Sequence, residues 1–211
     1  LYNYLGKEIE PGNNLLIDTI HDPKEIIPFK MAPFVYIGTI ITHLFGGSAG
    51  REGTALQMAG AISDQLSKPF RLNQQERKIL IISAISAGFG SVFGTPLAGA
   101  IFGLEVFLIG KIQYKAIFPA FTAAILADAV AKWWGAPHTQ YHVGFFPEVN
   151  WLNVVYAIIA GIAFGLTARF FSIFIHWLTN IFKTKIRYAP LRPVVGGAIV
   201  ALAVYLIGNT K

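Results

Sequence analysis

The stretch from Gly46 to Thr54 reads GGSAGREGT and lies between two apolar segments of the chain. Its glycines allow a sharp backbone turn and leave backbone N–H groups uncovered. Glu52 lies near the end of this elbow, and an ionisable residue at membrane depth is a functional candidate by default. A helix that begins near Glu52 would direct unpaired N–H donors and a partial positive charge into the elbow. We therefore expect an anion site here, in which the Glu52 carboxylate can itself occupy the anion's position.

The composition identifies the surroundings of this elbow as a membrane. The chain has 211 residues, of which 54% are hydrophobic and 13% are charged, and its mean hydropathy is +0.54. Ordinary soluble domains carry about 25% charged residues. A spanning helix needs about 20 apolar residues. Five apolar stretches are long enough by this measure: Met31 to Ser48, Ile79 to Gly110, Ala116 to Trp134, Trp151 to Phe182 and Pro193 to Gly208. The sequence therefore predicts an all-α, multi-pass integral membrane protein. This prediction weakens the alternative that Arg51 and Glu52 are merely a charged pair on a surface loop.

The ends of the chain indicate a fragment. Leu1 is not preceded by an initiator methionine, and the chain stops just after an apolar stretch. We expect residues 1–211 to form one transmembrane domain fragment of a longer protein. The absence of cysteine from the sequence excludes disulfides and thiolate metal sites.

The net charge of +6 is distributed as in a membrane protein. Lys and Arg cluster in the connectors 24–30, 68–78, 111–115 and 183–192, whereas the connector 135–150 contains neither. By the positive-inside rule the basic connectors are cytoplasmic and 135–150 is external. This topology places Glu52 in the external half of the membrane, and it predicts no nucleic-acid partner.

Two further segments have the signature of broken or re-entrant helices. The stretch Ile79 to Gly110 is too long for one crossing, and Gly94-Thr95-Pro96 interrupts it, which predicts a second helix from Pro96 to Ile109. Near the start, PGNNL (residues 11–15) precedes a segment that is too short to span, and Asn13 or Asn14 is a suitable N-cap. Broken helices whose ends meet near the midplane are how transporters build ion sites. The structural alternatives are a proline kink within one helix at Pro96 and an exposed Asn-Asn turn at residues 13 and 14.

Together these segments resemble the CLC family of chloride channels and proton-coupled anion antiporters. GREGT (residues 50–54) resembles the family's GREGP or GKEGP signature, and the run from Ser86 to Glu105 is similar to its helix-break-helix around APLAG. GNNL (residues 12–15) stands at the position of GSGIP. The resemblance covers nearly all of this chain and the middle of a CLC subunit, so the family's GxFxP motif and central tyrosine are expected beyond Lys211.

The departures from the family pattern resemble its fluoride-exporting branch. Asn13 replaces the serine of chloride-transporting members, Thr54 replaces the proline, and Val106 replaces the second of two glutamates at the inner end of the second half-helix. That branch retains the gating glutamate and exchanges fluoride for protons. Fluoride is a strong hydrogen-bond acceptor, so amide donors and a protonatable carboxyl are suitable partners for it.

The resemblance implies a set of site residues and partners. It assigns Glu52 as gate and proton carrier, and it assigns anion binding to Gly12, Asn13, Asn14, Gly50, Arg51, Gly53 and Thr54. It implies a homodimer in a bacterial-type cell membrane that transports fluoride and protons, is not an enzyme, and uses no cofactor or metal. A chloride channel or chloride/proton antiporter of the same family remains an alternative, and a non-transporting membrane scaffold is the alternative from a different class.

Overall fold

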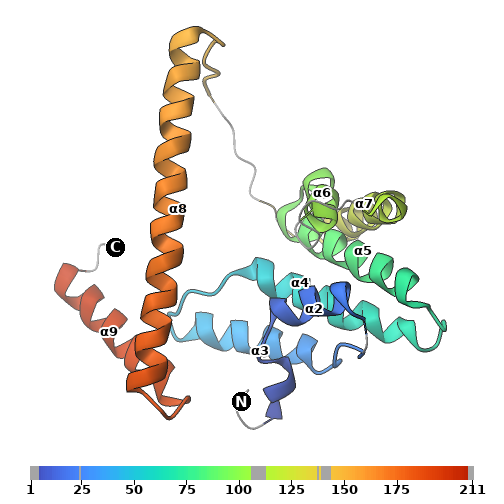
Figure 1. Ribbon diagram of the computed structural model, residues 1–211, viewed down its shortest axis with the longest axis horizontal. Coiled ribbons are helices and arrows are strands. Elements are labelled where there is room, and N and C mark those ends of the chain that lie inside the picture. Colours follow the sequence, from blue (N-terminus) through green and yellow to red (C-terminus); the bar gives the residue numbers. More distant parts are fainter. Residues whose placement is uncertain (1–4, 24, 106–112, 137, 139–143, 209–211) are drawn as a thin grey trace. The chain divides into compact units, whose positions relative to one another are not determined.

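The computed structural model describes residues 5–23, 25–105, 113–136, 138 and 144–208 (Figure 1). Every regular element in these ranges is a helix, so the predicted all-α class is confirmed. The helices are η1 (Lys7–Ile9), α2 (Asn13–His21), α3 (Met31–Leu44), α4 (Arg51–Asp64), η2 (Gln65–Ser67), α5 (Gln74–Phe93), α6 (Pro96–Glu105), η3 (Tyr114–Ala116), α7 (Ile117–Trp133), α8 (Trp151–Lys185) and α9 (Leu191–Ile207). They form two compact units, Leu1–Thr139 and Gln140–Lys211, which are described separately.

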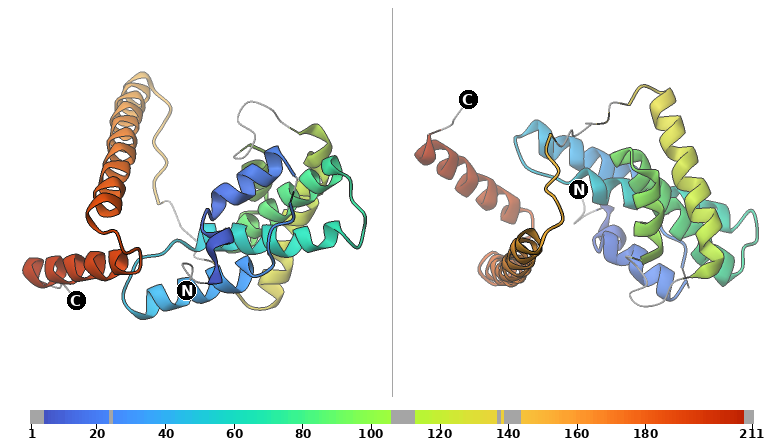
Figure 2. Two further views of the ribbon diagram at one scale, coloured as in Figure 1. Left: turned by 60° about the horizontal axis from the view of Figure 1, so that its bottom comes forward. Right: turned by 90° about the horizontal axis from the view of Figure 1, so that it is seen from above.

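The first unit is built around α5. This helix packs against α2, α4, α6 and α7, and the views of Figure 2 show α6 and α7 running alongside it. A complete capping box starts α5, because Asn73 accepts hydrogen bonds from the first turn and the Glu76 carboxylate accepts one from the Asn73 N–H at 2.8 Å. The core consists mainly of aliphatic side chains from η1, α2, α3 and α5, including Ile9, Leu16, Ile20, Met31, Ile81, Ile82 and Ile85. This core holds the amino ends of α2 and α4 in place.

The glycine elbow separates α3 from α4, as the sequence predicts. Helix α3 ends at Leu44, and Gly46 follows with a φ of 75°, which a residue with a side chain rarely adopts. The Gly47 N–H donates to the Thr42 carbonyl at 2.8 Å and closes the turn. At 14 residues α3 rises only about 21 Å, less than the hydrocarbon thickness. The expectation that the segment beginning at Met31 is long enough to span was therefore wrong: the glycines stop the helix before it reaches that length.

The predicted break after α5 is also confirmed. Gly94 has a φ of 67°, its N–H donates to the Gly90 carbonyl, and α6 begins at Pro96. The described part of α6 ends at Glu105, and both Val106 and the predicted end at Ile109 lie outside the described residues. Helix α6 folds back onto α5 through glycine: a Cβ built on Gly99 would lie 2.6 Å from the Gly90 nitrogen and 2.8 Å from the Ser86 carbonyl oxygen.

This close approach makes position 99 sensitive to any side chain. We expect Gly99→Val to lower stability by about 1–3 kcal/mol or more, because the atoms that the new side chain would meet belong to the backbone of α5 and cannot move alone. The full-length protein's melting temperature in detergent measures this effect. Ala98→Val is the matched control on the exposed side of the same helix. A Gly99→Val protein that melts with the wild type would contradict the packing of α6 on α5.

A buried ion pair joins the end of α4 to α5. The Arg77 guanidinium donates to both Asp64 oxygens, at 2.6 and 2.7 Å, and to the carbonyls of Pro23, at 2.8 Å, and Glu25. Asp64 is fully buried and also accepts from the Ile27 N–H at 2.8 Å. In the sequence, Arg77 counts among the charges of a predicted cytoplasmic connector. Its side chain is instead buried, because the Asp64 carboxylate and the two carbonyls accept the hydrogen bonds that water would accept at the surface.

The second unit consists of α8 and α9, joined by a short connector. Asn150 caps α8, since its side chain accepts from the Asn153 N–H at 2.9 Å. Neither helix contains a buried residue, although both are strongly apolar. Such surfaces are suited to lipid or to further helices.

Helices of membrane-spanning length and composition occur in both units. Among the described residues they are Tyr114–Trp133, with 20 residues, and Trp151–Lys185, with 35 residues. Helices α3, α6 and α9 are apolar but shorter, with 10 to 17 residues each. The glycines after Leu44 account for the short length of α3, and the break at Gly94 and Pro96 divides the segment that begins at Ile79 into α5 and α6.

Candidate functional site

Glu52 occupies the first turn of α4. The helix begins at Arg51, as predicted, and its N-cap is Gly50, which has no side chain to cap the exposed N–H groups. A Cβ built on Gly50 would lie 2.5 Å from Glu52 Oε2. The carboxylate is therefore folded back over the start of its own helix, on the end that carries partial positive charge. It is exposed and makes no hydrogen bond or ion pair with another described residue.

The amino end of α2 has a similar structure, but its cap differs from the prediction. The helix begins at Asn13 and its N-cap is Gly12, so the expectation that Asn13 or Asn14 caps the helix was wrong. Asn13 is the first residue inside the helix, and its side chain bonds to another helix instead. No side chain caps the start of α2, but the N–H groups of Asn14 and Leu15 donate to the Pro11 and Gly12 carbonyls at 3.2 and 3.1 Å.

The two amino ends meet through Asn13. Gln57 Nε2 donates to Asn13 Oδ1 at 3.0 Å, across 44 residues of sequence. A Cβ built on Gly53 would lie 3.4 Å from Asn13 Nδ2, and one built on Gly12 would lie 3.3 Å from Gln57 Nε2. A side chain at position 12 would crowd the Gln57 amide, and Gly12 also has a φ of 60°, whereas a Cβ at position 53 would make an ordinary contact with Asn13. The structure brings together the predicted site residues Gly12, Asn13 and Gly53.

Gln57 is a site residue that the sequence motifs did not identify. It lies four residues after Gly53, so the two share one face of α4. A polar residue one turn beyond the GREGT motif, in a helix that is otherwise mostly small or apolar on that side, was the available signal. Its partner Asn13 could not be identified from this spacing.

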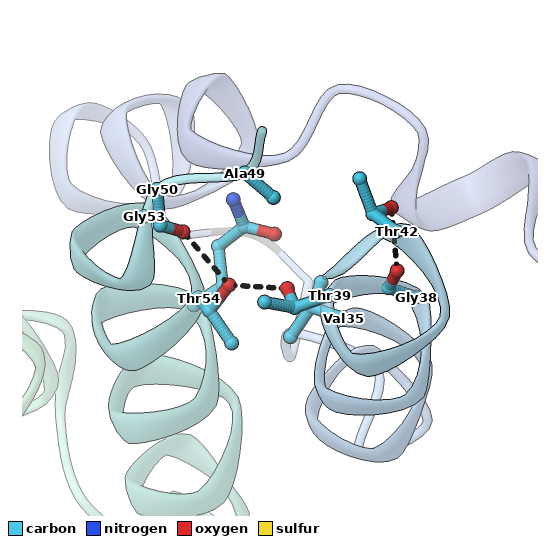
Figure 3. Close-up of a pocket in the computed structure, with 9 residues that line it drawn as sticks. Val35, Gly38, Thr39, Thr42, Ala49, Gly50, Gly53 and Thr54 are labelled. Atoms are coloured by element: carbon cyan, nitrogen blue, oxygen red, sulfur yellow. Dashed lines mark hydrogen bonds between the residues drawn. The ribbon is translucent and has the colours of Figure 1, made fainter. Parts of the chain in front are cut away.

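A pocket of about 350 Å³ lies between α3 and the start of α4 (Figure 3). Thr54 Oγ1 lies 2.7 Å from Thr39 Oγ1 and donates to the Gly50 carbonyl at 3.3 Å. The Thr42 hydroxyl donates to the Gly38 carbonyl at 2.7 Å. The lining combines hydroxyl, amide and backbone groups with small apolar ones, from Val35, Gly38, Thr39, Thr42, Ala49, Gly50, Gly53, Thr54 and Gln57. The predicted residues Gly50, Gly53 and Thr54 all belong to this pocket.

The side chains of Arg51 and Asn14 neither line this pocket nor take part in the contact between α2 and α4. Arg51 is exposed and lines a neighbouring hollow of about 250 Å³, which shares Thr39 and Thr54 with the first pocket. Asn14 is exposed, and its side chain has no hydrogen bond with the described residues. Arg51 is the first residue of α4, so its backbone N–H belongs to the helix amino end, whereas its side chain lies outside the pocket that Gly50, Gly53 and Thr54 line.

The arrangement is chemically suited to a small anion that competes with a carboxylate. The amino end of α4 contributes N–H donors and partial positive charge. At the amino end of α2 the N–H groups of Asn14 and Leu15 already donate to backbone carbonyls, so this end contributes mainly its partial positive charge. The Asn13 and Gln57 amides and the Thr39 and Thr54 hydroxyls add neutral polar groups. Glu52 is the negatively charged group on the same helix end. No group of three or more His, Cys, Asp or Glu side chains that could hold a metal ion occurs among the described residues.

Comparisons with known proteins place this geometry in a family. The sequence model of the family described as "Voltage gated chloride channel" matches residues 1–210. A "Chloride/fluoride channel protein" of Pseudomonas syringae pv. tomato is 51% identical over 208 residues, which are 99% of this chain and 46% of the relative. An "H(+)/Cl(-) exchange transporter ClcA" of Cronobacter sakazakii is 26% identical over 187 residues, covering 84% of this chain and 39% of the relative.

A solved structure gives the same result for the fold. The structure described as "Crystal structure of a CLC-type fluoride/proton antiporter" matches with a TM-score of 0.91 and 31% identity, over 98% of this chain and 52% of that chain. The chain thus spans about half the length of the proteins that it matches. The predicted CLC-type fold is confirmed, and with it the similarity to proteins named for fluoride. The chain belongs to the voltage-gated chloride channel (CLC) family of membrane-embedded ion channels and transporters.

Proposed function

We propose that this chain is the part of a CLC-type antiporter that contains its gate, and that the complete protein exports fluoride in exchange for protons. Glu52 is the gate and the proton carrier. The anion is held by the amino ends of α2 and α4, with Gly12, Asn13, Gly50, Gly53 and Thr54 around it. The complete protein spans a bacterial-type cell membrane several times and acts as a homodimer.

One observation carries most of this proposal. The Glu52 carboxylate lies over the uncapped amino end of α4, within reach of Gly50, and the amino end of α2 approaches the same turn at Gly53. An acidic side chain in the first turn stabilises a helix in any protein. In a transporter the same charge also competes with an anion that approaches the helix N–H groups. A transporter can use that competition as a gate.

The proposed cycle follows from the charge of Glu52. When ionised, the carboxylate is attracted to the helix N–H donors and closes the anion path. When protonated, it loses this attraction, swings away and leaves the donors to fluoride. Each exchange of positions couples proton movement to anion movement in the opposite direction. Val106 cannot carry a proton, so in this proposal protons reach Glu52 without a glutamate at that position.

The test uses the full-length protein in vesicles loaded with fluoride. An outward fluoride gradient should drive proton uptake when the membrane potential is clamped, and protein-free vesicles give the background from passive HF movement. If fluoride leaves the vesicles but the internal pH does not change, the protein is a channel and the antiport proposal is wrong.

Chloride/proton exchange is the second candidate, because a relative that is 26% identical is named an H(+)/Cl(-) exchange transporter. The same vesicles distinguish the two proposals when they are loaded with chloride. Proton uptake driven equally well by chloride would favour chloride exchange over fluoride export.

Asn13 is expected to contribute to the preference for fluoride. Asn13→Ser should reduce the fluoride-to-chloride efflux ratio by about tenfold, which corresponds to about 1.4 kcal/mol of differential binding, because it removes an amide donor beside Gly53. Parallel fluoride and chloride efflux assays measure the ratio. Asn180→Ser, on the exposed surface of α8, is the control for the same chemical change. An unchanged ratio in a folded Asn13→Ser protein would exclude Asn13 from selectivity.

A further inference from the structure

The amide of Asn13 has two chemically opposite ends, and only one of them suits an anion. Its Nδ2 group is a donor, whereas Oδ1 is an acceptor that repels negative charge. A side-chain amide can rotate by half a turn with little change in shape, so its own geometry does not select the end that faces the anion. Some neighbouring group must make that choice.

Gln57 is the group that contacts the acceptor end. Its Nε2 donates to Asn13 Oδ1 at 3.0 Å, and this bond occupies the oxygen. The Nδ2 end is then the part of the amide nearest to Gly53, 3.4 Å from the position of a Cβ on that residue, while Oδ1 is 3.9 Å from it. The donor end therefore faces the first turn of α4, where the Glu52 carboxylate and the anion compete for the same N–H groups.

The side chain of Gln57 lies between the pocket and the start of α2. It is partly buried and lines the pocket beside Gly53 and Thr54. Its amide group lies against Gly12, with Nε2 3.3 Å, and Cδ and Oε1 3.7 Å, from the position of a Cβ there. A side chain at position 12 would crowd this amide, so Gly12 leaves room for the Gln57 side chain to reach Asn13.

We propose that Gln57 is a positioning residue that fixes the Asn13 amide with its N–H₂ group toward the anion path and thereby sets the preference for fluoride. This proposal rests on the proposed function. Fluoride accepts strong, directed hydrogen bonds, so it gains more than chloride from a donor that is held at a constant orientation. Without Gln57 the Asn13 amide presents its donor and its acceptor end to the anion in turn. Fluoride then loses most of its binding advantage over chloride.

The experiment is a double-mutant cycle on the fluoride-to-chloride efflux ratio of the full-length protein in vesicles. Gln57→Met keeps the length of the side chain and removes its donor, and it should lower the ratio by about fivefold to tenfold. In an Asn13→Ala background the same substitution should have no further effect, because the amide that Gln57 orients is gone. Once the efflux from protein-free vesicles is subtracted, the ratio does not depend on how much protein is folded. Gln75→Met, at an exposed position in the first turn of α5, is the matched control and should leave the ratio unchanged.

The outcomes separate this inference from the proposed function. If the wild type shows no fluoride-driven proton uptake, the proposed function is wrong. If the wild type exchanges fluoride for protons but Gln57→Met keeps the wild-type ratio, only the positioning role is wrong. An effect of Gln57→Met that is equally large in the Asn13→Ala background would also overturn it, since Gln57 would then act without Asn13.

Discussion

Replacing Glu52 by glutamine should abolish proton movement coupled to fluoride, reducing it to the level of protein-free vesicles. Glutamine has nearly the same shape as glutamate, but it neither carries a transferable proton nor bears the charge that holds the carboxylate over the amino end of α4. The measurement is proton uptake driven by an outward fluoride gradient in vesicles that contain the full-length variant. Passive fluoride movement can persist, since the substitution removes titration and leaves the path in place.

Glu10→Gln provides the matched control for this experiment. Glu10 is an exposed carboxylate at the end of η1, and its replacement should leave coupled transport intact. Proton uptake by Glu52→Gln at the wild-type rate would show that Glu52 is neither gate nor proton carrier. It would leave membership of the family untouched, because that rests on the whole chain.

The second large effect is expected at the buried ion pair of Arg77 and Asp64. Arg77→Met should destabilise the protein by about 3–5 kcal/mol, because Asp64 remains fully buried with its charge uncompensated. The carbonyls of Pro23 and Glu25 lose their donor at the same time. A large fall in the melting temperature of the detergent-solubilised full-length protein is the expected result.

Two further variants make this prediction specific. Lys30→Met breaks the exposed pair with Glu8, whose side chains are 37% and 64% exposed, and it should cost less than about 1 kcal/mol. The double variant Arg77→Met with Asp64→Leu removes both charges and should recover part of the loss, because no unpaired charge stays buried. Equal melting temperatures for Arg77→Met and Lys30→Met would contradict the buried pair.

Local sequence was sufficient to predict the breaks in the helices. The turn between α3 and α4 and the turn between α5 and α6 both fall where glycine and proline stand, since these residues decide backbone conformation from their own structure. The start of α4 at Arg51 and of α6 at Pro96 follow for the same reason. The membrane class followed from composition alone, since so few charged residues could not cover a soluble domain.

The contacts between helices were decided only by the tertiary structure. Asn13 meets Gln57 across 44 residues, and Asp64 binds Arg77 across a turn between two helices. No local pattern specifies such pairs, because they depend on which faces of α2, α4 and α5 pack together. Arg77 resembles an interfacial lysine or arginine in the sequence and becomes a buried ion-pair partner only when Asp64 and two carbonyls surround it. The sequence by itself thus determined the class of protein, the breaks and the position of Glu52 on a helix end, since these depend on neighbouring residues. The tertiary structure decided what surrounds that helix end, since burial and long-range hydrogen bonds exist only once the helices have packed.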